Sequence, residues 1–189
     1  AGHVIAGLVV KYTAIGYDPA NVGLFGYSEG NIRNIGLKDC SIAISAQQCY
    51  AGSILGFQKS GTVSGCYANG TIGNNSEYGS TNYVGGIVGY LQGGTISGCC
   101  YAGEATVVNG VLGGVAGYAA IGATVSDCYN AGNLMSRNIG GGIVGTCPNG
   151  AIVTRCYNVG RIAADPQRQG AIIGDKLTNQ GITQCYFLK

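Results

Sequence analysis

Cysteine has the most versatile chemistry of the residues in this sequence. Nine of the 189 residues are Cys, whereas His occurs once, as His3. A thiol can act as a nucleophile, bind a soft metal or form a disulfide. Catalysis of the Cys-His or Ser-His-Asp type would have to use His3, which lies at the start of the chain. A thiolate metal site needs a compact set such as Cys-x-x-Cys, which this sequence lacks.

The eight carboxylates do not form an acid–base pair in the sequence pattern. Asp39 and Asp127 share a position in the repeat described below, but they lie three coils apart. At a strand spacing of about 4.8 Å this is about 14 Å, too far for a glycosidase pair. We therefore predict that the protein is not an enzyme, with no catalytic residue, no cofactor and no metal ligand. If it did cleave a substrate, Asp127, Arg155 and Asp175 on late coils would be the first residues to test.

Low charge argues against several kinds of partner. Charged residues make up 10% of the sequence and the net charge is +2, which is too small and scattered for a nucleic-acid-binding surface. The uncharged stretch 105–126 is long enough to span a bilayer, but it follows the same repeat as its neighbours, so we predict no membrane span. Glycine is abundant, with 36 residues, and 46% of the residues are hydrophobic, so this is not a disordered polar chain.

The elements that position the cysteines come from a repeat. A step of two small residues, mostly Gly, with two apolar residues between them recurs six times. Its closing glycines, 28 to 33 residues apart, are Gly26, Gly56, Gly89, Gly117, Gly145 and Gly174. A cysteine follows each of them after 10 to 14 residues, namely Cys40, Cys66, Cys99, Cys128, Cys156 and Cys185. Six copies in phase predict one structural unit that repeats along the chain.

This repeat predicts an all-β fold. Its segments are short, β-branched and bounded by Gly, Asn and Ser, as expected for strands and turns. Three short strands per repeat cannot bury an apolar face alone, but stacked coils can. The sequence therefore predicts a parallel β-helix, or β-solenoid, of about six coils of 28–33 residues, right-handed by the general preference of parallel crossovers. We assign residues 17–189 to this domain, and residues 1–16 to an apolar N-terminal segment that caps it or pairs with another subunit.

The cysteines and closing glycines are expected to form structural ladders, one residue per coil. An apolar residue lies three positions before each cysteine, so a straight strand would put the two on opposite faces. A bend at the residue before the cysteine lets both point inward, and that residue varies: Gly65, Gly98, Asp127, Arg155 and Gln184. Asp127 and Arg155, on adjacent coils, are expected to form a surface ion pair. The thiols are either buried and inert, or at least one disulfide joins cysteines outside the ladder: Cys49, Cys100 and Cys147.

Aromatic residues recur just after the closing glycines, as Tyr27, Phe57, Tyr90 and Tyr118. We predict that they stack as an aromatic ladder. The alternative is an exposed tyrosine strip whose rings stack on sugars. Asn130 and Asn158 occupy one equivalent position of successive repeats, and they favour a turn ladder over a ligand site.

Three runs carry a resemblance to a known repeat: YVGGIVGYLQGGTISGCCYAGEA, LGGVAGYAAIGATVSDCYNAGNL and IGGGIVGTCPNGAIVTRCYNVGRI, with GLFGYSEGNIRNIGLKDCSI as the opening copy. They resemble GLUG-motif repeats, over about residues 22–189. Such repeats occur in large bacterial surface and secreted proteins, including IgA-protease-like and haemagglutinin-like proteins. The resemblance therefore implies an extracellular or cell-surface location in a bacterium. It implies no catalytic role, because the sequence holds no peptidase motif.

The two ends of the chain look complementary. The chain stops four residues after Cys185, where a further strand is expected, and residues 1–4 match residues 131–134. Residues 5–16 are apolar apart from Lys11. We predict a homo-oligomer assembled head to tail, in which the strand 182–188 pairs with the next chain near residues 37–44 and continues the cysteine ladder. The junction residues are Gly2, His3 and Val4 from one chain and Ile182, Tyr186 and Phe187 from the other.

The function expected from these features is that of a non-enzymatic extracellular structural solenoid, a stalk or filament subunit assembled by coil stacking. Two other functions stay open. A fragment of a larger surface adhesin would bind host glycan or protein. An accessory repeat region would belong to an IgA-protease-like peptidase whose active site lies elsewhere.

Overall fold

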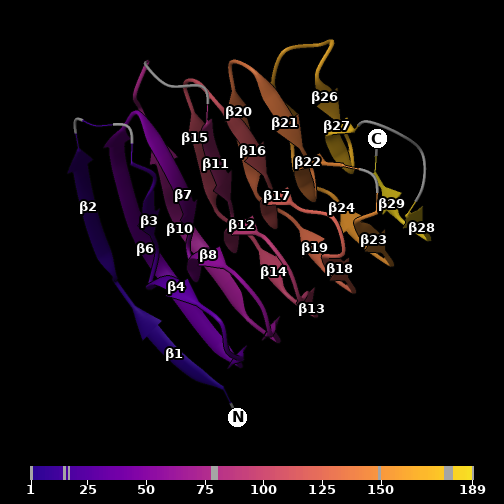
Figure 1. Ribbon diagram of the computed structural model, residues 1–189, viewed down its shortest axis with the longest axis horizontal. Coiled ribbons are helices and arrows are strands. Elements are labelled where there is room, and N and C mark those ends of the chain that lie inside the picture. Colours follow the sequence, from indigo (N-terminus) through magenta and orange to yellow (C-terminus); the bar gives the residue numbers. More distant parts are fainter. Residues whose placement is uncertain are drawn as a thin grey trace.

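Short parallel strands, stacked from one end of the molecule to the other, make up the computed structural model of the chain (Figure 1). The structure describes residues 2–14, 16, 18–77, 81–148, 150–176 and 181–188. Within these residues every regular element is a strand, and the strands form four parallel sheets. The fold is a β-solenoid of about six turns, which confirms the predicted fold class.

Each coil passes in turn through sheets B, C, D and A, so it holds four strand positions rather than the three that the sequence suggested. Sheet B holds β3 (Ala20–Val22), β7 (Gln48–Gly52), β11 (Thr81–Gly85), β16 (Val111–Gly113), β21 (Ile139–Gly141) and β26 (Gln169–Gly170). Sheet C holds β4 (Phe25–Ser28), β8 (Leu55–Gln58), β12 (Val88–Leu91), β17 (Ala116–Ala119), β22 (Val144–Cys147) and β27 (Ile173–Lys176). Sheet D holds β5 (Ile32–Arg33), β9 (Thr62–Ser64), β13 (Thr95–Ser97), β18 (Thr124–Ser126), β23 (Ile152–Thr154) and β28 (Ile182–Thr183).

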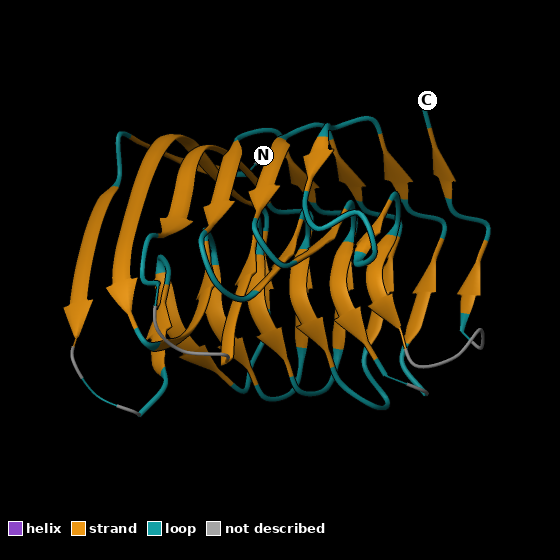
Figure 2. Cartoon of the chain, turned by 90° about the horizontal axis from the view of Figure 1, so that it is seen from above, coloured by secondary structure: helices purple, strands orange, loops and turns teal. Residues whose placement is uncertain are grey.

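Sheet A is the widest face of the solenoid, because each coil crosses it with one long strand or two short ones. It holds β1 (His3–Ala6), β2 (Val9–Ala14), β6 (Ile35–Ala46), β10 (Tyr67–Asn74), β14 (Cys100–Tyr101), β15 (Glu104–Val107), β19 (Tyr129–Asn130), β20 (Asn133–Ser136), β24 (Tyr157–Asn158), β25 (Ile162–Ala163) and β29 (Tyr186–Phe187). The strands of all sheets lie side by side along the solenoid, and those of the inner coils pair with the coil before and the coil after (Figure 2).

The closing glycines let sheets B and C come close together. A Cβ at Gly117 would lie 2.7 Å from both the Gly89 carbonyl oxygen and the Val84 backbone nitrogen, which leaves no room for a side chain. None of the six closing glycines has a positive φ, so close approach of backbones, rather than an unusual backbone conformation, requires glycine here.

The corner between sheets D and A is the bend that the spacing predicted. The residue before each ladder cysteine has a positive φ, from 50° at Arg155 to 60° at Gly65 and Gly98. Asn34 takes this position in the first coil, with a φ of 57°. Its backbone nitrogen donates to the Ser64 carbonyl, as that of Gly65 donates to the Ser97 carbonyl one coil later. The bend turns both the apolar residue and the cysteine toward the core.

Residues 3–14 of the N-terminal segment extend sheet A. Both β1 and β2 pair in parallel with β6, while Ala1 and Ile15 lie outside the described residues. The predicted match of residues 1–4 with residues 131–134 is wrong. Val4 lies beside Gly36, which pairs with Tyr67 of the next coil, so Val4 belongs to the row of Tyr67. The row of Leu134 runs instead through Ala105, Ile72 and Ile42, and it reaches the N-terminal segment at Val10.

Strands of sheets A to D also account for the uncharged stretch 105–126. Across the described ranges, we find no helix that is both long and apolar enough for a membrane crossing.

Candidate functional site

The structure contains the predicted cysteine ladder, but one of its members differs from the prediction. Sheet A register places Cys66, Cys99, Cys128, Cys156 and Cys185 in one inward row. Cys40 is not in it, because Cys40 lies beside Gly70, and Ile35 takes the ladder position of the first coil. An irregularity in the pairing between Ala68 and Gly70 shifts the register, which explains the longer spacing before Cys40.

Four of the five ladder thiols are buried in this arrangement. The first four are at most 1% exposed, and Cys185 is partly exposed in the last coil. All five are free thiols, as are Cys49 and Cys100, so the disulfide alternative is not seen for those two, and Cys147 is buried at the end of β22. The Cys128 Sγ donates to the Ser126 carbonyl at 3.0 Å. Contacts with Cys156 and Cys99, together with burial, raise the pKa of Cys128 well above its usual range, so the thiolate nucleophile is suppressed.

The aromatic residues stack as predicted. Ring centroids of Tyr27 and Phe57 lie 5.6 Å apart, those of Phe57 and Tyr90 5.2 Å, and those of Tyr90 and Tyr118 4.8 Å, with interplanar angles of 15° or less. Tyr50 contacts Tyr90 from sheet B at 4.9 Å. Each ring of Phe57 and Tyr90 is therefore covered on both faces by its neighbours, so this column offers edges rather than faces to a sugar.

Asparagines also form a buried ladder. The Asn130 side-chain amide donates to the Asn158 side-chain carbonyl at 2.9 Å, and both residues hydrogen-bond to glycine backbone two residues on. Both are nearly inaccessible. Tyr101 occupies the same row one coil earlier, and a Cβ at Gly132 would lie 2.9 Å from its ring. These polar groups hold turns together and are not placed to bind a ligand.

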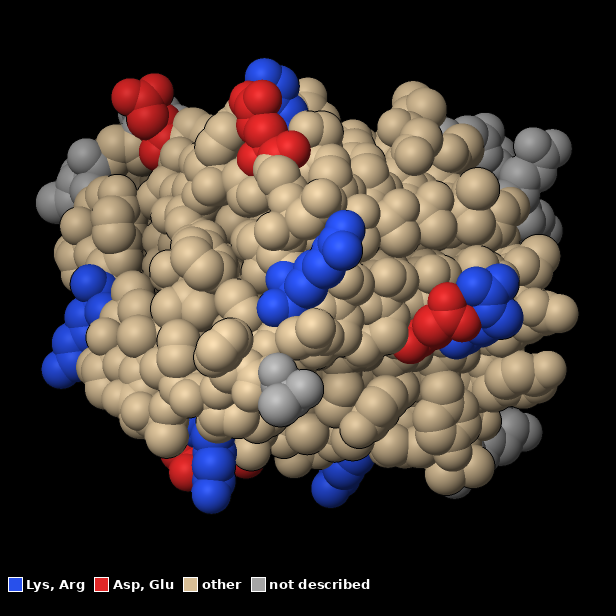
Figure 3. All heavy atoms as spheres, turned by 90° about the horizontal axis from the view of Figure 1, so that it is seen from below, with Lys and Arg blue, Asp and Glu red and all other residues tan. Residues whose placement is uncertain are grey.

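Four of the carboxylates in the described residues form surface ion pairs with basic residues: Glu29, Glu77, Asp127 and Asp175. The Asp127–Arg155 pair is present, with the guanidinium Nε 2.6 Å from one carboxylate oxygen, and these hydrogen bonds hold the pKa of Asp127 below its usual value. Asp39 does not share the position of Asp127, which Asn34 takes instead. Asp175 pairs with Arg168 at 2.6 Å. On the face shown in Figure 3, charged side chains stand singly or as such pairs on an uncharged surface.

The junction residues lie at the two ends of the solenoid. Gly2, His3 and Val4 are exposed at the β1 edge, and the His3 backbone nitrogen donates to the Asn34 carbonyl. Tyr186 and Phe187 form β29 at the other end, where they are 66% and 49% exposed. Ile182 lies in β28 and pairs with Val153. The structure therefore separates the two groups by the full length of the rod (Figure 1).

The outer face of sheet A is a feature that the repeat did not single out. Outward residues of successive coils form a tyrosine row, made of Tyr67, Cys100, Tyr129, Tyr157 and Tyr186. Four residues further along each coil they form a polar row, made of Ser41, Thr71, Glu104, Asn133 and Arg161. Between the two rows lies a floor of smaller residues: Asn69, Ala102, Ala131 and Val159.

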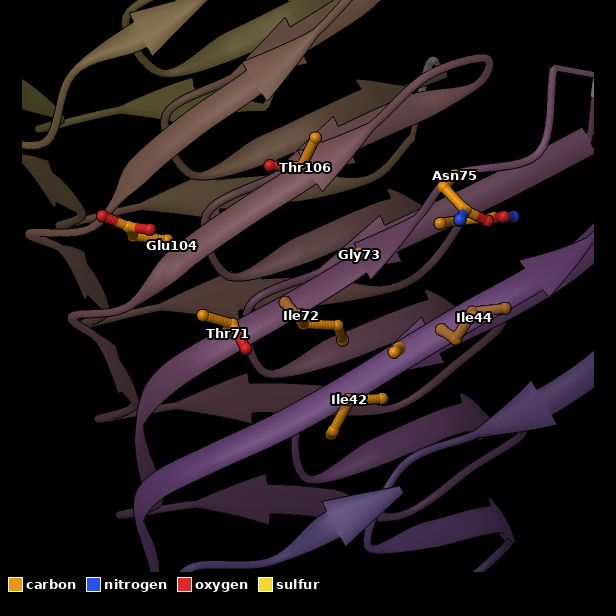
Figure 4. A pocket seen from close by; sticks show the side chains of 10 residues that line it. Ile42, Ile44, Thr71, Ile72, Gly73, Asn75, Glu104 and Thr106 are labelled. Atoms are coloured by element: carbon orange, nitrogen blue, oxygen red, sulfur yellow. The ribbon is translucent and has the colours of Figure 1, made fainter. Parts of the chain in front are cut away.

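Hollows flank the polar row on both sides. One of about 400 Å³ lies on the floor side, lined by Asn69, Ala102, Ala131 and the polar-row residues beside them. Two more, of about 260 and 370 Å³, lie on the other side. Figure 4 shows one of these, with Thr71 and Gly73 on β10 and Glu104 and Thr106 on the next strand. Every second residue of a strand points to the same face. Counting in twos from the tyrosine after each ladder cysteine would therefore have revealed this outer face from the sequence.

Comparisons with known proteins do not assign a role to any of these features. No family model, curated protein or solved structure matches the chain.

Proposed function

We propose that the chain is a non-enzymatic structural β-solenoid, a stalk or filament subunit that grows by coil stacking. The likeness of its repeats to GLUG-motif repeats supports a place at a bacterial surface or in the extracellular medium. Buried thiols, stacked rings and ion pairs such as Asp127–Arg155 join neighbouring coils, which fits a structural role.

An exposed apolar edge formed by β1 and β2 is the observation that carries the proposal, and the last coil also exposes apolar residues. At one end, all four residues of β1 are exposed, and Val4 and Val9 are 57% and 61% exposed. At the other end, Tyr186 and Leu188 are 66% and 65% exposed. Large apolar side chains beside unpaired strand edges are the usual requirements for strand addition.

The junction differs from the one that the sequence suggested. β6 pairs with β1 and β2 on one side and with β10 on the other, so residues 37–44 have no free edge for a second chain. The edge open to a neighbour in sheet A is that of β1 and β2. If sheets B, C and D of two chains continue without a gap, β29 of one chain and β1 of the next would occupy the same place.

We infer that β29 leaves sheet A at this junction and that β1 of the next chain takes its place. It is held by two register pairs with β24, whereas β1 and β2 together form a long edge opposite β6. With β29 displaced, β1 and β2 of the next chain could pair with β24 and β25. The junction would consist of main-chain and apolar contacts, so its affinity should depend weakly on salt.

Edge-blocking substitutions test this assembly. The backbone nitrogens of His3 and Gly7 donate to the carbonyls of Asn34 and Lys38 on the β6 side, so those of Val4 and Ala6 between them point away. Val4→Pro combined with Ala6→Pro should therefore remove outward donors without breaking bonds inside the chain. We expect the intact chain to form rods of increasing length with concentration, in light scattering and negative-stain microscopy, and the double proline variant to stay monomeric.

Two further variants sharpen the result. Val4→Ala with Ala6→Ser keeps both donors and should assemble like the intact chain. Deleting residues 186–189 should promote assembly, because it removes the competing strand. An intact chain that stays monomeric at millimolar concentration, with or without this deletion, would overturn the filament proposal in favour of the adhesin function.

A further inference from the structure

We propose that the outer face of sheet A binds a neutral linear polysaccharide, laid along the solenoid axis between the tyrosine row and the polar row. This goes beyond the structural role, and it does not depend on assembly, because coil stacking leaves the outer face of sheet A uncovered.

The size of the trough suits one sugar chain. The two rows are four residues apart on each coil, which is roughly 13 Å along a strand. The floor between them carries Ala102 and Ala131 on adjacent coils, and the hollow there has a volume of about 400 Å³. The trough runs along the stacked coils, and the height of one coil is close to the length of one pyranose in an extended chain. Successive sugars would therefore meet equivalent side chains.

The two walls supply the two kinds of contact that sugars need. Tyr67, Tyr129 and Tyr157 are 40%, 46% and 38% exposed, so their rings keep open surface, unlike the rings of Phe57 and Tyr90 inside the sheet C column. Aromatic rings favour the apolar faces of sugars, and their hydroxyls add a polar handle. Across the floor, Thr71, Glu104 and Asn133 are exposed and can exchange hydrogen bonds with sugar hydroxyls.

Backbone pairing argues against an extended peptide as the ligand. β10, β15 and β20 each pair with a strand on both sides, so they have no free edge that a peptide strand could extend. A ligand on this face must bind through side chains alone.

The charge of the trough argues for a neutral glycan. Asp39 and Glu104 line the hollow, and Arg161 lies two coils beyond Glu104 in the polar row, so the trough carries charges of both signs. Neither a polyanion nor a polycation would find a continuous complementary wall there.

Affinity electrophoresis of the full chain tests the site. The protein would be run through native gels that contain hydroxyethyl cellulose, galactomannan or laminarin, three soluble neutral polysaccharides of different linkage. We expect retardation in at least one gel and not in gels with hyaluronate, a polyanion of similar size. Tyr129→Ala with Tyr157→Ala should weaken the retardation roughly tenfold, as expected for the loss of one to two ring contacts.

Matched variants separate binding from folding. Tyr27→Ala removes a ring that is 49% exposed at the end of the sheet C column and should leave retardation unchanged. Ala131→Phe fills the floor while keeping both walls, in a row that already holds Val159, and should abolish retardation. Thermal melts would show that each variant is folded. Absence of retardation in all three neutral gels, or equal losses in the Tyr27→Ala and Tyr129→Ala variants, would refute the site.

Discussion

At the scale of single residues, the cysteine ladder shows how a reactive side chain can serve as a packing unit. Each thiol sits one coil above the next and donates to a backbone carbonyl two residues earlier, as Cys66 does to Ser64 and Cys156 to Thr154. The side chain is small enough to repeat at the strand spacing and needs no partner of opposite charge. A row of such residues therefore fills the corner between sheets D and A, with its first four thiols shielded from solvent.

Protection of these thiols from alkylation is the first prediction. Iodoacetamide on the native protein should leave Cys66, Cys99, Cys128 and Cys156 unlabelled, whereas the partly exposed Cys100 and Cys185 should react first, as read by peptide mass spectrometry. Cys128→Ser should lower the free energy of unfolding by about 1 to 3 kcal/mol, because it buries a hydroxyl. Rapid labelling of the four buried thiols without denaturant would contradict their inward position.

Alkaline pH should weaken the aromatic column. Burial, followed by the neighbouring tyrosines, raises the pKa of Tyr90 to about 12 from its usual 10.0. The folded state therefore keeps a proton that the unfolded state loses, so this stabilisation is complete below pH 10 and declines as the pH rises toward 12. Chemical denaturation across this range, with near-ultraviolet absorbance to follow phenolate, measures the effect. Tyr90→Phe keeps the ring and should reduce the loss, and an unchanged loss would contradict this cause.

At the scale of elements, the corner before each cysteine decides where a strand of sheet A begins. The sequence predicted this bend because the apolar residue and the cysteine are an odd number of residues apart. It misplaced the first coil, because Asp39 before Cys40 also has a positive φ, of 53°, and imitates the corner that Asn34 forms. Spacing alone cannot tell a corner from an irregularity inside a long strand such as β6.

Two glycines, Gly98 at the corner before β14 and Gly70 in β10, should respond differently to alanine. Gly98 has a φ of 60°, and the nearest atom to an added Cβ is 3.9 Å away, so Gly98→Ala should cost only the backbone strain, roughly 1 kcal/mol. Gly70 has a φ of 112°, and its Cβ would also collide with the backbone of Cys40, so Gly70→Ala should cost roughly 3 kcal/mol or more.

Denaturant midpoints would measure both changes. Gly30→Ala is the control, because its Cβ meets no atom within 4 Å and its φ is not positive, so it should be nearly neutral. Equal losses for Gly70→Ala and Gly98→Ala would show that contact between coils does not restrict this position.

At the scale of the whole molecule, the periodic features were predictable and the others were not. Coil number, parallel pairing and the inward ladders all follow from landmarks that recur at every turn. Residues 3–14 lack a cysteine and the Gly step, so nothing in the sequence set their register, and Val10 rather than Val4 proved equivalent to Leu134. The outer face of sheet A was not predicted, because the small and polar residues of its floor and polar row produce no hydrophobic pattern, and the tyrosine after each ladder cysteine was its only recurring landmark.

The direction of the backbone hydrogen bonds has a mechanical consequence. They run from coil to coil, so a pull applied between the two end coils is carried at every coil boundary by the bonds of all four sheets together. Such a rod resists stretching until its weakest coil opens, and then yields one turn at a time. A released turn of 28 residues, such as that from Gly117 to Gly145, adds about 90 to 100 Å of slack chain. A stalk built this way would absorb sudden tension in steps of nearly equal length instead of transmitting it to whatever it anchors.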